Sequence, residues 1–127
     1  MKQLGLLEAS SAEISHGGRY RWRLTRVWGQ GARVCWIMLN PSTADASVDD
    51  PTIRRCRGFS QAWGFGGLHV VNLFPLRASE PRVLREVNAS IRRGIGLGRS
   101  NREWIKECAA DAGKVVCAWG AGLNPAR

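Results

Sequence analysis

Long apolar runs are missing from this sequence, and their absence argues against a helical membrane protein. No hydrophobic stretch approaches the ~20 residues that a membrane-spanning helix needs. Residues 1–11 also lack the compact apolar segment of a secretory signal peptide. We therefore expect a cytoplasmic protein without a membrane partner.

The chain is also short. With 127 residues, of which 44% are apolar, it can bury one hydrophobic core but not the cores of two ordinary domains. No internal repeat or low-complexity segment divides it. We expect a single domain over residues 1–127 that acts as a monomer.

Cysteine and histidine are scarce. The four cysteines stand far apart, form no C-x-x-C pair and each fall within an apolar pattern: Cys35, Cys56, Cys108 and Cys117. We interpret them as reduced core residues rather than a disulfide or a zinc site. Of the two histidines, His16 lies in a polar loop, where we expect exposure, and His69 lies in an apolar strand pattern, where we expect a structural role.

Acidic residues are outnumbered by basic ones, 10 to 19, which gives a formal net charge of +9. Sixteen of the basic residues are arginines, whose planar fork is well suited to holding phosphate. This excess of basic residues, most of them arginines, favours a polyanionic partner. Solubility combined with arginine-rich codons gives the same composition, so charge alone does not separate the two explanations.

Apolar segments predict the strands. Residues 34–39 and 68–74 are apolar on both faces, as buried parallel strands are, and prolines follow both of them. Residues 114–119 form a third parallel candidate that ends at Gly120. Residues 19–28 alternate instead, with Tyr20, Trp22 and Leu24 on one face and Arg21 and Arg23 on the other. That pattern is typical of a half-exposed strand.

Capping residues predict three helices. Asp50 and Pro51 begin the first, which ends near Gly64 and buries one side: Ile53, Cys56, Phe59, Ser60 and Trp63. The second begins at Ser79 and Pro81 and ends near Gly94, and the third has the capping-box residues Ser100 and Glu103. The order of elements predicts a three-layer α/β fold with a mainly parallel central sheet and an N-terminal antiparallel edge strand.

Two asparagines stand where predicted parallel strands end. Asn40 is followed at once by Pro41, and Asn72 precedes Pro75 by three residues. Ligands of open α/β sheets bind at the carboxyl ends of the strands. Because an amide both donates and accepts, it can read the edge of a nucleobase. We expect both amides to face one cavity that is large enough for a flat heterocycle, although asparagine is also a common turn residue.

Four motifs in this order resemble those of the uracil-DNA glycosylase superfamily. They are Met38–Ser42, in the asparagine form of the mismatch-specific branch, then 50–54 with 61–65, then His69–Arg77, and finally Val115–Gly120. The nearer resemblance is to a bacterial and phage family known only as domain of unknown function 1643. Its characteristic segments are 38–45, 49–56 and 64–78. Both families continue to a His-Pro segment, which we expect this chain to lack.

The glycosylase resemblance implies roles for site residues. Asn40 would orient the attacking water, which Asp45 or Asp49 could activate. Asn72 would hold the edge of the base, beside Met38 and Phe74. The phosphates would be contacted by a further set: Ser42, Thr43, Arg54, Arg55 and Arg77. Such hydrolysis needs neither a metal nor a redox cofactor.

Several of these residues also have ordinary structural explanations. Asp50 suits a helix cap better than a catalytic acid, which leaves Asp49 as the freer of the two. Phe74 and the tryptophans suit core packing. Arg54, Arg55, Arg57 and Arg77 suit solvated helix or loop positions.

Three functional hypotheses follow. The first is a glycosylase-like protein that binds nucleic acid, DNA above all, or a nucleotide, and hydrolyses an N-glycosidic bond. The second is a catalytically inactive nucleic-acid-binding module that keeps the pocket and the arginines. The third is an enzyme that acts on a free nucleotide or nucleoside. A shared fold does not choose among them, because function belongs to the site.

Overall fold

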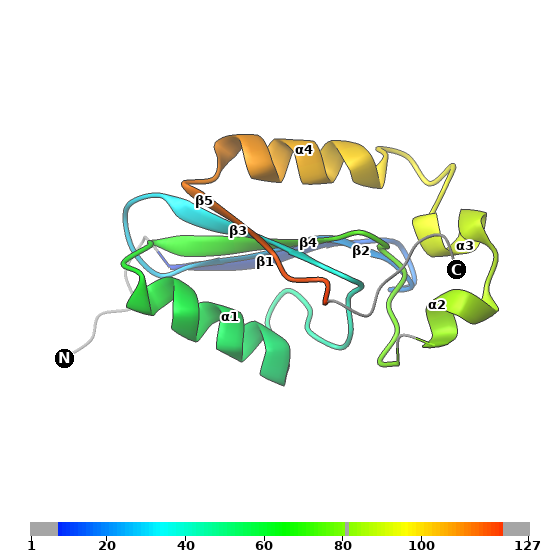
Figure 1. Cartoon of the computed structure of the whole chain (residues 1–127), viewed down its shortest axis with the longest axis horizontal. Helices are drawn as coiled ribbons and strands as arrows, with labels where there is room; N and C mark the ends of the chain where they lie inside the picture. The colour runs from blue at the N-terminus through cyan, green and yellow to red at the C-terminus, as the bar shows by residue number, and fades with distance from the viewer. Residues whose placement is uncertain (1–7, 81, 121–127) are drawn as a thin grey trace.

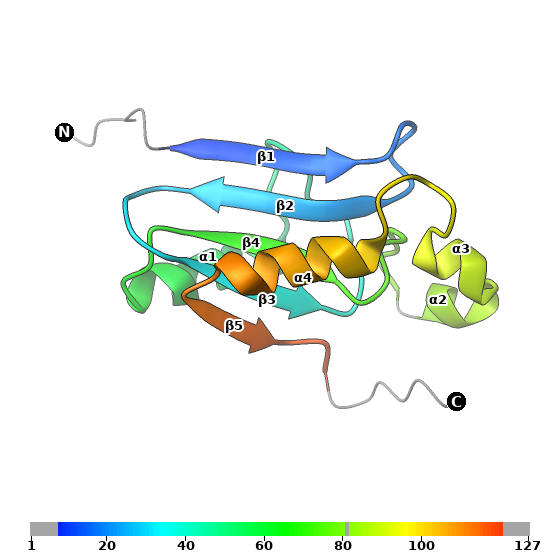
Figure 2. The same ribbon diagram turned by 90° about the horizontal axis from the view of Figure 1, so that it is seen from above.

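The apolar segments of the sequence form the parallel half of a five-stranded mixed sheet. The computed structural model describes residues 8–80 and 82–120. The strands run in the order β1-β2-β4-β3-β5 across the sheet (Figure 2). Their bounds are β1 (Ala9–Ile14), β2 (Arg21–Val27), β3 (Arg33–Met38), β4 (Gly67–Asn72) and β5 (Lys114–Cys117). The parallel set β4, β3 and β5 was predicted correctly.

Helices cover both faces of the sheet and produce three layers (Figure 1). Helix α1 (Pro51–Ala62) packs on one face and α4 (Asn101–Asp111) on the other. The short helices α2 (Arg82–Glu86) and α3 (Ala89–Arg93) lie beyond the carboxyl ends of the parallel strands. None of the helices within the described ranges is long and apolar enough to cross a membrane.

The caps predicted for α1 and α4 are confirmed. Asp50 accepts a hydrogen bond from the amide of Ile53 at 2.9 Å, and Ser100 accepts one from the amide of Glu103 at 3.3 Å. The single helix predicted from Ser79 to Gly94 is wrong. Asn88 interrupts it and caps α3, because its side chain accepts from the Ile91 amide. Pro81, predicted at the start of that helix, lies outside the described residues.

The predicted N-terminal antiparallel edge strand is present as β1, whereas the half-exposed strand predicted over residues 19–28 is wrong. β2 is an internal strand, paired antiparallel with both β1 and β4, and most of its side chains are buried. The edge is β1, which the sequence pattern missed because its residues are mainly small and polar, Ala-Ser-Ser-Ala-Glu-Ile. With two antiparallel pairings beside two parallel ones, the sheet is mixed rather than mainly parallel.

A β-bulge in β2 changes which side chains face α1. Glu13 pairs with Arg23, but the next residue, Ile14, pairs with Arg21, so Trp22 is the extra residue. A bulge interrupts the strict alternation of faces. Arg23 therefore points toward α4, where it contacts Trp104, while Arg21 points to the α1 side and is only 2% exposed. The predicted shared, exposed face of Arg21 and Arg23 is wrong.

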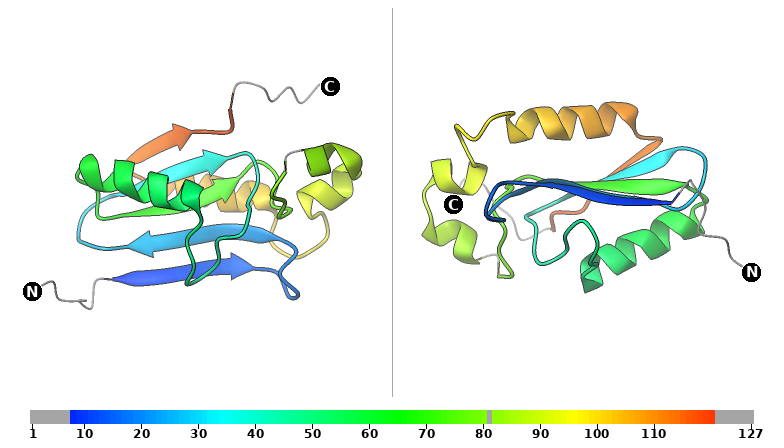
Figure 3. Two further views of the ribbon diagram at one scale, coloured as in Figure 1. Left: turned by 90° about the horizontal axis from the view of Figure 1, so that it is seen from below. Right: turned by 180° about the vertical axis from the view of Figure 1, so that it is seen from behind.

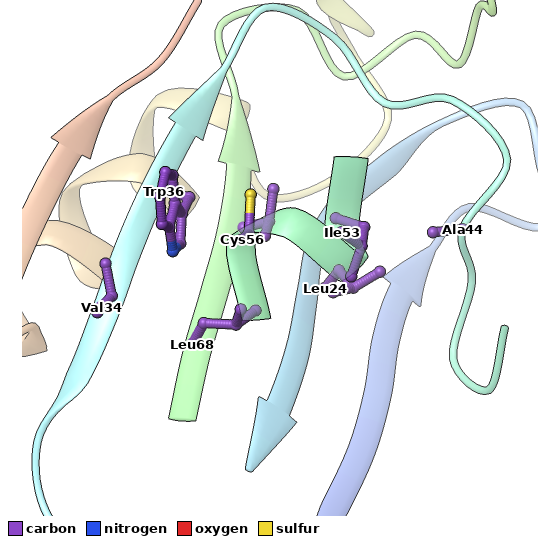
Figure 4. Close-up of a cluster of buried hydrophobic side chains, with 8 residues drawn as sticks. Leu24, Val34, Trp36, Ala44, Ile53, Cys56 and Leu68 are labelled. Atoms are coloured by element: carbon purple, nitrogen blue, oxygen red, sulfur yellow. The ribbon is translucent and has the colours of Figure 1, made fainter. Parts of the chain in front are cut away.

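The largest core cluster lies between the sheet and α1 (Figure 4). Leu24, Val34 and Trp36 from the strands pack there with Ile53 and Cys56 of α1. Ala44 joins this cluster from the loop that follows β3. That loop crosses the α1 face of the sheet as far as β1 (Figure 3), where the Ser10 hydroxyl donates to the carbonyl of Ala46.

The far end of α1 is more exposed than its helical pattern predicts. Ile53, Cys56 and Ser60 are buried as expected, but Phe59 and Trp63 are 53% and 43% exposed. Trp63 still stacks on Trp36, with ring centroids 5.7 Å apart. The expectation that tryptophans lie chiefly in the core therefore fails for Trp63.

The cysteines are not all reduced. Cys35 of β3 and Cys108 of α4 form a disulfide with their Cα atoms 5.9 Å apart, a typical separation. Both are buried in the cluster on the α4 face. Cys56 is free and buried, as expected, whereas free Cys117 is exposed. The sequence could not show the pairing, because 73 positions separate the two cysteines.

We predict that Cys35→Ala lowers the free energy of unfolding by about 2–4 kcal/mol in the absence of a reductant, because the disulfide restricts the unfolded chain. Urea denaturation of both proteins, repeated with a thiol reductant, measures this. The reductant should shrink the difference to the packing loss alone. An equal difference under both conditions would show that no disulfide stabilises the purified protein.

Candidate functional site

A small cavity lies at the carboxyl ends of β3 and β4, beneath the start of α1. Its volume is about 40 Å³, and it opens to solvent. The strands contribute Arg21 from β2, Met38 and Val70, with Asn40 and Asn72 at their ends. Ser42 in the loop and the start of α1, with Asp50, Thr52 and Ile53, complete the lining. The two asparagines predicted to share a cavity do line the same one, but at about 40 Å³ it is smaller than the predicted space for a flat heterocycle.

Asn72 is the most enclosed polar residue of this cavity. Its side chain is 1% exposed, and neither Nδ2 nor Oδ1 has a hydrogen-bond partner within the described residues. Its backbone is fixed by the register of β4 with Met38 and by Asn101, whose Nδ2 donates to the Asn72 carbonyl at 2.7 Å. An amide that is buried without partners is uncommon in folded proteins. It leaves one donor group and one acceptor available in the cavity.

Asn40 is held in one orientation. Its Nδ2 donates to the carbonyls of Ala78 at 2.7 Å and Pro41 at 3.1 Å. Those bonds use both protons of the amide nitrogen, and within the described part of the chain Oδ1 makes no hydrogen bond. The amide of Asn40 therefore offers the cavity a hydrogen-bond acceptor.

Arg21 brings a buried positive charge to the same lining. Its Nη1 donates to the Ala44 carbonyl at 3.0 Å, while its buried Nε has no partner within the described residues. Burial lowers the pKa of the guanidinium to about 10, and the nearby carboxylate of Asp50 opposes that shift. Arg21 thus stays protonated at neutral pH.

The sequence profile of one family matches residues 21–127, all but the N-terminal strand and the loop after it. This chain belongs to the DUF1643 family. The family is described as "Protein of unknown function (DUF1643)". No curated protein and no solved structure matches the chain. Every residue that lines the cavity lies within the range shared with the DUF1643 family.

The carboxylates predicted to activate water are engaged elsewhere. Asp49 accepts from Arg26 Nε at 2.8 Å and from Arg57 Nη1 at 3.3 Å, so it is not freer than Asp50. Asp45 accepts from the amides of Ser47 and Val48, which lowers the pKa of its carboxyl. Neither Asp45 nor Asp49 lines the cavity. Their catalytic roles remain predictions.

Asp50 does line the cavity, but both of its oxygens accept hydrogen bonds from the backbone. Oδ1 accepts from Ile53 and Oδ2 from the amide of Ala44 at 3.3 Å. The expectation that Asp50 caps a helix is confirmed. The same carboxylate also fixes the loop on the other side of the cavity.

Arg77, predicted to contact phosphate, fastens two loops. Its guanidinium donates to the carbonyls of Ser42, Thr43 and Gly18, each at 3.0 Å. Arg54 and Arg55 are exposed on α1, and Arg54 donates to the Asp49 carbonyl at 3.2 Å. Of the three arginines predicted to contact phosphate, Arg55 is the one whose guanidinium makes no hydrogen bond within the described residues.

The remaining predicted site residues divide into two groups. Met38 and Ser42 line the cavity, and the Ser42 hydroxyl donates to that of Ser79 at 3.4 Å. Thr43 is exposed beside the cavity, outside its lining. Phe74 packs against the cluster around Tyr20, with the guanidinium of Arg92 over its ring, which matches the core-packing alternative.

No histidine lines this cavity. His16 is exposed and His69 is a structural residue, as predicted. Arg33 is only a donor, so His69 Nε2, 3.3 Å from it, must accept. Nδ1 then carries the proton and donates to the Thr25 hydroxyl at 2.7 Å. The ring is neutral, and burial, together with Arg23 and Arg33, lowers its pKa to about 4.

Sequence reasoning missed three residues of this site. The bulge that turns Arg21 toward the cavity cannot be read from the sequence. Thr52 lies inside a helical pattern, which gives no sign of a site. Asn101 acts from a distant helix, by donating to the backbone carbonyl of Asn72. Only the charge of Arg21, inside an apolar strand, offered a signal. Within the described residues, no group of three His, Cys, Asp or Glu is arranged to hold a metal ion.

We predict that Asp49→Ala lowers the free energy of unfolding by about 3 kcal/mol, because Arg26, only 2% exposed, loses its carboxylate partner. Urea denaturation measures the loss. The matched control is Glu80→Gln, which breaks the exposed pair with Arg82 and should cost less than about 1 kcal/mol. Equal stabilities of the Asp49 variant and the unmodified protein would refute the role of this pair.

We predict that His69 makes the fold less stable as the pH falls from about 6.5 to 4. In that window the unfolded imidazole binds a proton and the folded one does not, because the folded pKa is about 4. The contribution, fully present above pH 6.5, is expected to be about 2 kcal/mol, since the ring is partly solvated. Stability curves for the unmodified protein and His69→Gln should converge toward pH 4; parallel curves would contradict this assignment.

Proposed function

We propose that this protein binds a nucleobase, presented by DNA or by a nucleotide, at the cavity between Asn40 and Asn72 and hydrolyses the bond between base and sugar. The observation that carries the proposal is the amide of Asn72, buried with both polar atoms unpaired. Leaving a buried polar group unpaired costs about 1–3 kcal/mol. A ligand that pairs with the amide recovers this energy.

The edge of a base supplies what Asn72 lacks. The carbonyl oxygen of a base accepts from Nδ2 and the neighbouring ring N–H donates to Oδ1, which is the pairing that an amide makes with a base edge. The resemblance of Met38–Ser42 and His69–Arg77 to glycosylase motifs supports the same reading, since these segments carry Asn40 and Asn72. A base is therefore the ligand class that best fits the lining.

Asn40 would position the water. Its amide nitrogen is held by Ala78 and Pro41, so Oδ1 can accept a hydrogen bond from a water molecule in a fixed direction. That water attacks C1′ of the sugar, the bond from C1′ to the base nitrogen breaks, and its electron pair leaves with the base. The water becomes the sugar hydroxyl and its second proton passes to solvent. Because asparagine is a weak base, we expect slow turnover.

The size of the cavity limits how a base can bind. At about 40 Å³ it holds a few water-sized groups, whereas an engineered cavity that binds benzene measures about 150 Å³. Only the edge of a base enters, while the ring lies at the mouth between the Ser42 loop and α1. The mouth has to widen for closer approach, which requires movement of the loop tied down by Arg77.

Charge supports a nucleic-acid substrate. Helix α1, which contributes Thr52 and Ile53 to the lining, also carries the exposed side chains of Arg54 and Arg55. The chain has a net charge of +9. A phosphate backbone laid along α1 would bring its base to the cavity mouth while its phosphates contact these arginines.

The test is a base-release assay on single-stranded and duplex DNA that carries uracil or another altered base, and on free nucleotides. We expect Asn40→Ala to lower kcat by about 100-fold, as loss of a positioned catalytic group does. Asn72→Ala should raise KM. The control is Asn88→Ala, which removes the α3 cap and changes no residue of the cavity lining. Equal rates for the Asn40 variant and the unmodified protein would remove Asn40 from the mechanism.

Absence of base release from every substrate would contradict the hydrolytic proposal. DNA affinity measured in the same samples then decides what is left. Affinity that falls with salt at a log-log slope of about −0.9 per contacted phosphate, without release of a base, would favour a binding module. Tight nucleotide binding that does not depend on DNA length would favour a nucleotide enzyme.

A further inference from the structure

Two arginines on β2 are equally buried but differ in their partners. Arg21 and Arg26 are each 2% exposed. Arg26 Nε pairs with the carboxylate of Asp49 at 2.8 Å, and its other nitrogens donate to backbone carbonyls, including that of Asp45 at 2.6 Å. Arg21 makes one hydrogen bond, to the Ala44 carbonyl, and forms no ion pair within the described residues.

The fully buried unpaired atoms of the cavity include two donors, Arg21 Nε and Asn72 Nδ2, and one acceptor, Asn72 Oδ1. Asn40 Oδ1 adds a second acceptor. The carboxylate of Asp50 is the negative group nearest to this lining, but its oxygens already accept from the amides of Ile53 and Ala44. Arg26 and Arg77 add further positive charge near Arg21. The cavity therefore contains a buried positive charge that no carboxylate of the described lining pairs with.

We propose that Arg21 binds a negatively charged oxygen of the ligand, with Asn72 beside it. A buried cation is normally paired, and Arg26 shows how this fold pairs one when a carboxylate is at hand. For Arg21 the missing partner is the ligand. The chemistry is that of an oxyanion, supplied by an ionised carbonyl oxygen on a base, by a carboxylate or by a phosphate.

The volume of the cavity agrees with such a group. One buried water needs about 10–15 Å³, so about 40 Å³ holds two or three water-sized groups. That is the size of a carboxylate or of the oxygen edge of a ring. The remainder of the ligand would lie in the mouth of the cavity.

This inference uses the cavity of the proposed function and adds a role in its reaction. When the bond to C1′ breaks, the electron pair leaves with the base, and in an oxo base the negative charge is shared with a carbonyl oxygen. Arg21 is the one cation in the described lining that could hold that oxygen. It would then favour departure of the base without taking or giving a proton.

The experiment is calorimetric titration of the full chain with barbiturate, uracil and inorganic phosphate at neutral pH. Barbiturate and uracil have similar shapes, but barbiturate is an anion. We expect barbiturate to bind about 10-fold more tightly than uracil, as a charge-assisted hydrogen bond does relative to a neutral one. Arg21→Gln should abolish the preference, and Arg21→Lys should keep part of it. Arg85→Gln, on the exposed side of α2, is the control.

Melting temperatures separate a ligand-binding arginine from a structural one. Removal of the unpaired buried charge should offset the lost hydrogen bond to the Ala44 carbonyl, so Arg21→Gln should melt at about the temperature of the unmodified protein. Arg26→Gln should melt lower, because Asp49 loses its closer cationic partner and keeps only Arg57. A clear loss of stability in Arg21→Gln would mean that the fold already satisfies Arg21, and would overturn the proposal.

The calorimetric titrations also decide whether the inference holds. Barbiturate binding that depends on Arg21 supports a base oxygen, and phosphate binding that depends on Arg21 supports a phosphate group. Binding of neither anion, or binding that Arg21→Gln leaves unchanged, overturns the inference. Anion binding through Arg21 without base release would leave this inference standing and remove the proposed hydrolysis. Base release without any preference for anions would support the proposed hydrolysis and overturn the inference on Arg21.

Discussion

The arrangement of the cavity depends on how the loop between β3 and α1 is held against the sheet. Arginines from two strand regions hold it through backbone carbonyls, Arg26 and Arg21 from β2 and Arg77 from the segment after β4. Asp50 holds the loop through the opposite kind of group, since its carboxylate accepts a hydrogen bond from the backbone amide of Ala44. Carbonyl groups in an irregular loop need donors when they are buried, and guanidinium groups supply several at once. The loop thereby becomes a wall of the cavity.

Parallel pairing brings the two asparagines together. Asn72 lies opposite Met38 in the β3–β4 register, and Asn40 follows two residues later on the neighbouring strand. The two amides then differ because their surroundings differ. Asn40 is held by Ala78 and Pro41, while Asn72 has no partner within the described residues. One amide is thus oriented in advance and the other is available to a ligand, a division suited to the proposed hydrolysis.

Much of the arginine content that suggested a polyanionic partner has structural uses. Arg26 and Arg77 bind backbone carbonyls and a carboxylate, and Arg23 bridges Glu13 and Glu107 across the sheet. Net charge alone therefore overstates the surface available to phosphate. Arg55, exposed on α1, and Arg21, buried in the cavity, are the more informative residues, because neither forms an ion pair with a carboxylate within the described residues. Arg55 supports the nucleic-acid part of the proposed function, and Arg21 carries the oxyanion inference.

Local patterns in the sequence determined the three parallel strands, the caps at Asp50 and Ser100, and the place of Asn40 and Asn72 at strand ends. Such features depend on neighbouring residues, so they can be predicted without the fold. Tertiary structure alone decided that Cys35 meets Cys108, that Asp49 belongs to Arg26 and that the bulge at Trp22 turns Arg21 into the cavity. The physical reason is that strand register and long-range contacts set these pairings, and neither is encoded in any short stretch of residues.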